Sequence, residues 1–224
     1  MSMLLGGCGL LGGDMTYRYK MTVEVETPDG PRTGSSVIEV RTHESPAFPG
    51  PEAGGERSRV RGEAVAVDLP AGTLFALLQA ENGRGAEIYA WALLPEPPTK
   101  GATPEDRRAN LNALRSVAGR AELQRANYPM LVTFRDLSDP TTVETVNPAD
   151  LNTSFGPGYV LHRITVQMTD EPVTTAIERW LPNRFWTLWA ENRKRQISKG
   201  SAMTNPYFKS LVGKLNRNDF ISER

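Results

Sequence analysis

The stretch "TYRYKMTVEVETPDG", residues 16–30, decides the fold because its apolar and polar residues alternate. Met21, Val23 and Val25 share one parity, with polar side chains between them, which is the pattern of a half-buried β-strand. The Thr-Pro-Asp-Gly sequence at 27–30 places proline and glycine where a tight turn needs them. A second alternating stretch, "SSVIEVRT", occupies residues 35–42. The two stretches together predict an antiparallel hairpin.

The most apolar part of the chain predicts the centre of a sheet. The segment "GEAVAVDLPAG" at 62–72 reads as a strand. The segments "TLFALLQA" at 73–80 and "AEIYAWALLP" at 86–95 flank Asn82-Gly83, which is a strong hairpin signal. Because both arms are apolar on both faces, we expect two central strands with Trp91 largely buried. A helix that Thr103 caps, running to about Val117 and closed by Gly119, is expected to cover them.

The second half of the chain predicts further strands and then helices. Strands are expected within 128–137 and 159–172, the latter with His162 on the same apolar face as Ile164. Residues 43–58 predict a long loop, and a single helical turn is expected at 148–151. After Pro172 we expect three helices, one over 173–181, one from Asn183 and one from Asn205.

These patterns predict a single α+β fold, mainly an antiparallel β-sheet with one covering helix and a helical C-terminal segment. The expected organisation is a leader and tether at 1–14, an α+β domain at 15–182, and a basic helical extension at 183–224 packed on that domain.

Composition excludes several classes of protein. The 224 residues carry 26 Lys and Arg against 26 Asp and Glu, so the formal net charge is zero and no nucleic-acid partner is predicted. A single cysteine excludes an intramolecular disulfide framework and a CxxC metal site. No apolar run approaches the roughly 20 residues that a membrane-spanning helix needs.

The single cysteine lies in the leader "MSMLLGGCGLLGGD". Leu5-Gly6-Gly7-Cys8 resembles a bacterial lipobox, in which small residues precede the cysteine that receives diacylglycerol. The motif implies a signal peptide, acylation of Cys8, and attachment to the membrane through it, with 9–13 as a flexible tether. By analogy with lipoprotein sorting, Gly9 in the position after the cysteine favours the outer membrane.

The leader also has an alternative interpretation, in which Cys8 is a small apolar residue of an ordinary terminus. Only five residues precede the glycines, and none is Lys or Arg, whereas a signal peptide has a basic start and 7–15 apolar residues. Either the match is accidental or the true start lies upstream of Met1.

The chain contains no familiar catalytic motif. GxSxG, Walker, HExxH and post-strand GxGxxG patterns are absent from the sequence, and we expect no cofactor, no metal and no catalytic residue. The alternative is a hydrolase whose site combines His162 with acidic loop residues. A cleft joining His162 to Asp136 or Asp150 would favour that enzyme. Asp136, Asp139 and Asp150 together could also form a hard-cation site, and the alternative for them is a set of solvated turns.

The C-terminal segment offers a candidate binding surface, because aromatic and basic residues recur there at helical spacing. Such a surface fits an acidic partner or anionic lipid, and the alternative is a set of packing helices with solvated charges. The candidate binding residues are Trp186, Trp189, Arg193, Lys194 and Arg195.

Two segments, "ITVQMTDEPVTTAIERWLP" and "MTVEVETPDGPRTGSSVIEVR", are similar to those of uncharacterised Gram-negative bacterial proteins that often carry a lipobox. The resemblance implies a bacterial α+β protein and brings no activity with it. The sequence therefore predicts an envelope lipoprotein that faces the periplasm and acts by binding or scaffolding an envelope partner, with an immunity-like role within that class. The hydrolase remains the alternative, and the partner, the substrate and the oligomeric state are not predicted.

Overall fold

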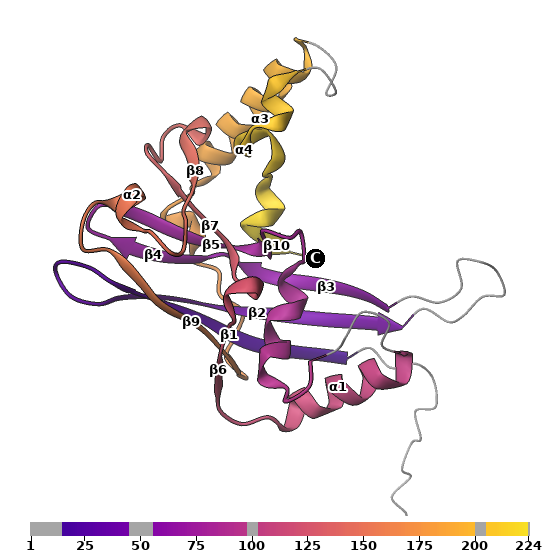
Figure 1. Ribbon diagram of the computed structural model, residues 1–224. Helices are drawn as coiled ribbons and strands as arrows, with labels where there is room; N and C mark the ends of the chain where they lie inside the picture. Colours follow the sequence, from indigo (N-terminus) through magenta and orange to yellow (C-terminus); the bar gives the residue numbers. More distant parts are fainter. Residues whose placement is uncertain (1–14, 45–55, 98–102, 200–204, 224) are drawn as a thin grey trace, which may run out of the picture.

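The computed structural model describes residues 15–44, 56–97, 103–199 and 205–223, which form two antiparallel sheets and several short helices (Figure 1). The six-stranded sheet has the order β10-β3-β2-β1-β9-β6, and the four-stranded sheet has the order β4-β5-β7-β8. The predicted α+β class with mostly antiparallel pairing is confirmed.

The six-stranded sheet is built on the predicted hairpin. Tyr19 of β1 lies opposite Ile38 of β2, and the turn closes through a 2.9 Å hydrogen bond from the Gly30 amide to the Thr27 carbonyl. Gly30 has a φ of +101°, which explains why glycine ends the turn. The strands are β1 Met15–Glu26, β2 Arg32–Glu44, β3 Glu56–Glu63, β6 Arg120–Glu122, β9 Val160–Met168 and β10 Ile221–Glu223.

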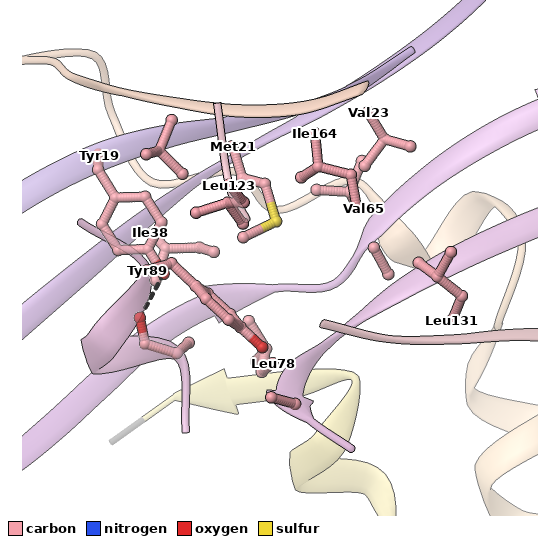
Figure 2. Close-up of a cluster of buried hydrophobic side chains, with 14 of the residues drawn as sticks. Tyr19, Met21, Val23, Ile38, Val65, Leu78, Tyr89, Leu123, Leu131 and Ile164 are labelled. Atoms are coloured by element: carbon pink, nitrogen blue, oxygen red, sulfur yellow. Dashed lines mark hydrogen bonds between the residues drawn. The ribbon is translucent and has the colours of Figure 1, made fainter. Parts of the chain in front are cut away.

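The four-stranded sheet consists of β4 Val65–Leu69, β5 Gly72–Ala80, β7 Pro129–Phe134 and β8 Val143–Thr145. As its sequence predicts, β5 is covered on both faces. Leu74 and Leu78 enter the core between the two sheets, which we call the first core, whereas Phe75 and Leu77 enter a second core. The first core also holds Tyr19, Met21, Ile38 and Val65 (Figure 2).

The second core lies between the four-stranded sheet and the C-terminal helices. Phe134 of β7 makes edge contacts with Phe185, at 5.2 Å between ring centroids, and with Trp189 at 6.2 Å. Figure 1 shows α3 (Asn183–Ile197) and α4 (Leu211–Lys214) together at one end of the molecule, far from α1 (Pro104–Ser116). The last strand, β10, pairs with β3, so the C-terminal segment adds an edge strand to the six-stranded sheet.

Helix α1 begins as predicted at a capping box, in which the Thr103 side chain and Asp106 exchange hydrogen bonds. Leu111 and Leu114 carry its apolar stripe into the first core, and Gly119 follows with a φ of +106°. The outer face of the four-stranded sheet is covered by α3 and its neighbours. The remaining short helices are η1 Ala86–Leu93, η2 Arg125–Asn127, η3 Pro140–Thr142, α2 Asn152–Phe155, η4 Ile177–Arg179, η5 Pro206–Lys209 and η6 Arg217–Asp219.

The prediction of a strand at 86–95 is wrong, because Ala86–Leu93 form the 3₁₀ helix η1. The Asn82-Gly83 turn does form, with a 2.8 Å bond from the Ala80 amide to the Arg84 carbonyl, but only one isolated bridge follows it. Two tyrosine hydroxyls of β1 then bond to η1 carbonyls. A run that is apolar at nearly every position suits a buried helix as well as a strand. Trp91 is consequently only half-buried.

The helix expected at 173–181 is also wrong. Only Ile177–Arg179 is helical within this range. The preceding Thr174 bonds to both main-chain groups of Val37, which holds the β-branched run 173–175 against β2. The helix expected from Asn205 begins where predicted, since the Asn205 side chain accepts the Tyr207 amide, but it breaks into η5 and α4 at Ser210, whose ψ is 162°. The single helical turn expected at 148–151 is displaced, because these residues form a non-helical turn and the helical turn is α2 at Asn152–Phe155. Of the predicted loop 43–58, residues 43–44 and 56–58 instead belong to β2 and β3, and residues 45–55 lie outside the described residues.

Candidate functional site

Cys8 and the rest of the leader lie outside the described residues, so the structure does not test the lipidation site. The first described residue, Met15, opens a strand that pairs with β2, and β1 also pairs with β9. Met15 follows Cys8 by seven positions, which span at most about 25 Å when extended. No helix within the described ranges is long and apolar enough to cross a membrane.

The two tryptophans of the predicted binding surface face inward. Trp189 is 4% exposed, and Trp186 is partly buried against it in the second core, with the two rings stacked at 5.8 Å. Phe220 also contacts both rings. These two residues therefore attach α3 to the four-stranded sheet, which is the packing role that the sequence left open as the alternative.

The three basic residues of the predicted surface divide into two groups. Arg193 is half-buried, donates a 3.1 Å hydrogen bond to the Gly213 carbonyl and lies 5.6 Å over the Phe208 ring, so it ties α3 to α4. Lys194 and Arg195 are exposed. Residues 183–224 contain nine Lys or Arg against three Asp or Glu, a net charge of +6, and the rest of the neutral chain therefore carries −6.

The residues of the alternative hydrolase site do not converge. A register shift between Glu24 and Val25 displaces β9, and His162 is exposed instead of lying on the apolar face with Ile164. Asp136 and Asp139 each bond to their own turns, and Asp150 bonds to Thr153. Neither His162 nor any of these aspartates lines the cavities beside Glu63, Tyr128 or Trp91. Among the described residues, no group of three or more His, Cys, Asp or Glu could hold a metal ion.

Glu39, on a central strand of the six-stranded sheet, is a buried carboxylate that the sequence did not predict. Alternation predicts an exposed Glu39, but its side chain is 1% exposed and pairs with Arg18 at 2.7 Å and Arg41 at 3.0 Å. Burial works against ionisation, but hydrogen bonds from the two guanidinium groups outweigh it and hold the pKa of the Glu39 carboxyl below its usual value. Both guanidinium groups lie on neighbouring positions of the outer face, so they cover the carboxylate that they pair with.

A second buried carboxylate, Glu63 at the end of β3, holds the segment that leads to α3. Its Oε2 accepts hydrogen bonds from the Ala176 amide at 2.6 Å and the Ile177 amide at 2.9 Å. Burial raises the pKa of the Glu63 carboxyl despite these bonds. Glu63 also lines a cavity of about 430 Å³ together with Arg61 and Arg217. The mixed charges of this cavity favour no single class of ligand.

Two further cavities flank a wall made by the turn at 81–85 and η2. One has a volume of about 470 Å³ and is lined by residues including Asn82, Arg125, Tyr128 and Asn147. The other has a volume of about 210 Å³ and lies beside Trp91, over which Arg84 is placed at 5.8 Å. Both are rich in hydrogen-bonding side chains, which no sequence motif had indicated.

No protein-family model, curated protein or solved structure matches this chain.

Proposed function

We propose that this protein is a lipid-anchored component of the bacterial cell envelope that faces the periplasm and acts by binding or scaffolding a protein partner. The observation that carries the proposal is the Leu5-Gly6-Gly7-Cys8 motif, which ends seven residues before the first strand. The acyl chains on Cys8 would hold the fold within about 25 Å of the bilayer. Two or three chains on one residue give stable anchoring, whereas a single chain is marginal.

The arrangement of polar residues supports binding over hydrolysis. The exposed His162 and the turn-capping aspartates of the described chain make no joint site. The exposed part of the basic segment, with Lys194 and Arg195 at its centre, is complementary to an acidic protein surface, and Trp186, Trp189 and Arg193 hold that segment in place. A periplasmic partner that is neutralised by surface recognition, as in immunity proteins, fits this chemistry.

The anchoring is tested by expressing Cys8→Ser with the complete natural leader in the native host. We expect the variant to lose incorporation of labelled palmitate and to leave the membrane fraction. Gly9→Asp serves as the matched control because it retains the cysteine, and we expect it to stay lipidated and to move from the outer to the inner membrane. Retention of Cys8→Ser in the membrane fraction would contradict the anchor.

The binding surface is tested by crosslinking in intact cells of the native host. The double variant Lys194→Glu/Arg195→Glu should lose the crosslinked species of the wild type, whereas Arg59→Glu, an exposed charge reversal on β3, should retain it. Equal loss in both variants would show that the C-terminal segment is not the contact surface.

A further inference from the structure

The cavity of about 470 Å³ beside η2 has the size of a small-molecule site and a distinctive set of polar groups. Its walls come from the turn after β5, from η2 with the start of β7, and from the end of β8 with the loop that follows. The side chains that matter are those of Glu81, Asn82, Arg125, Tyr128 and Asn147.

Local turns orient the two amide side chains of this cavity. The Oδ1 atom of Asn82 accepts the Arg84 amide at 3.0 Å. The Oδ1 atom of Asn147 accepts the Ala149 amide at 2.9 Å and an Arg125 guanidinium N–H at 3.1 Å. Because the oxygens are engaged, each side chain presents its amino group as a donor. Fixing these donors before binding lowers the entropy that a ligand must overcome.

The other walls supply an acceptor and a flat apolar surface. Glu81 is exposed at the cavity and can accept hydrogen bonds, and its charge balances that of Arg125. The Tyr128 ring is half-buried, and burial, with a smaller contribution from Glu122, raises the pKa of its hydroxyl, which therefore stays neutral. Pro129 and Pro148 extend the apolar wall. A cavity of balanced charge does not select a phosphate or a polyanion.

We propose that this cavity binds a saccharide carrying acetamido groups. The acetamido carbonyl can only accept, which matches the amino groups of Asn82 and Asn147, and its N–H matches the Glu81 carboxylate. The C–H face of a sugar ring suits the electron-rich face of Tyr128. This inference goes beyond the proposed anchoring and partner binding, and it uses a different surface from α3.

The test uses the full chain carrying Cys8→Ser, so that binding is measured without lipid. Chitotetraose, a tetramer of N-acetylglucosamine, is titrated by calorimetry, and maltotetraose, which has no acetamido groups, is titrated in parallel. We expect saturable binding of chitotetraose at least about tenfold tighter than binding of maltotetraose, consistent with loss of a donor–acceptor pair. Side-chain amide NMR signals of Asn82 and Asn147 should shift during the titration.

Variants then locate the site. Tyr128→Leu should weaken chitotetraose binding about fivefold or more, whereas Tyr128→Phe, which keeps the ring, should remain within about twofold of wild type. Asn82→Asp keeps the oxygen that accepts the Arg84 amide but replaces the donor, and should weaken binding about tenfold. Tyr207→Leu, at a half-buried tyrosine on η5, is the matched control and should have no effect. Absence of chitotetraose binding, equal binding of maltotetraose, or binding unchanged by both Tyr128→Leu and Asn82→Asp would overturn the proposal.

Discussion

Tyr19 and Tyr89 both bury a hydroxyl group, but only the Tyr19 hydroxyl makes a hydrogen bond within the described residues. Both side chains are fully buried and lie together in the first core (Figure 2). The Tyr19 hydroxyl donates a 2.6 Å hydrogen bond to the Ala86 carbonyl, the first residue of η1. The Tyr89 hydroxyl, on η1 itself, has no hydrogen-bond partner among the described residues, and burial strongly raises its pKa. Replacing each tyrosine with phenylalanine removes only the oxygen.

The two substitutions should have different signs. Tyr19→Phe removes a buried bond and leaves the Ala86 carbonyl without its partner, which should cost about 1–2 kcal/mol of unfolding free energy. Tyr89→Phe removes a buried polar group that makes no bond, so stability should be unchanged or should rise by up to about 1 kcal/mol.

Urea denaturation of the two single variants, followed by tryptophan fluorescence and circular dichroism, measures both values. A loss above about 1 kcal/mol in Tyr89→Phe would mean that its hydroxyl does have a partner. An unchanged Tyr19→Phe would mean that η1 is not held to β1 through Ala86. The second result would refute the placement of residues 86–93 against β1 in the first core.

Three further predictions concern stability. Glu39→Gln should cost about 1–3 kcal/mol of unfolding free energy at pH 7. Because the folded-state pKa of Glu39 is lowered, the difference in stability from wild type should shrink as the pH falls below the unfolded-state pKa of about 4.3. A difference that persists undiminished at pH 3 in urea melts would count against the ion pairs. Trp189→Ala should cost about 3–5 kcal/mol by leaving a cavity in the second core, and a loss below 1 kcal/mol would show that α3 is not packed there. Trp91→Ala should cost clearly less than Trp189→Ala in the same denaturation assay, and the reverse order would argue for the central strand that the sequence had predicted.

The parts of the fold that the sequence predicted correctly are those where local chemistry and tertiary packing agree. The hairpin at 16–42 has a strict apolar–polar period of two and a turn that its own residues specify, so local sequence alone determines how its two strands pair. The cap at Thr103 likewise depends on residues within four positions of each other.

The failures come from contacts between distant parts of the chain. Residues 86–93 are helical, and the carbonyls of Ala86 and Glu87 accept hydrogen bonds from two β1 tyrosine hydroxyls that lie 67 and 70 residues earlier in the sequence. Residues 173–175 are not helical, and Thr174 is hydrogen-bonded to Val37 on β2 instead. His162 does not lie on the apolar face because a register shift in the pairing of β1 with β9 changes the direction of its side chain, and no local sequence pattern predicts that shift.

The candidate sites show the same division. Basic and aromatic residues at helical spacing correctly marked a helix at 183–197, but spacing alone could not tell which residues face the sheet, and Trp186 and Trp189 proved to be packing residues. The buried carboxylates Glu39 and Glu63 and the cavity beside η2 depend on residues brought together only by the fold.

Intact-mass and peptide mass spectrometry of the protein from its native host tests the central proposal most directly. We expect a mature chain that begins at Cys8 and carries diacylglycerol on its thiol, with the residues before Cys8 removed. An unmodified Cys8 with residues 1–7 still attached would contradict the lipid anchor and the envelope location that rests on it.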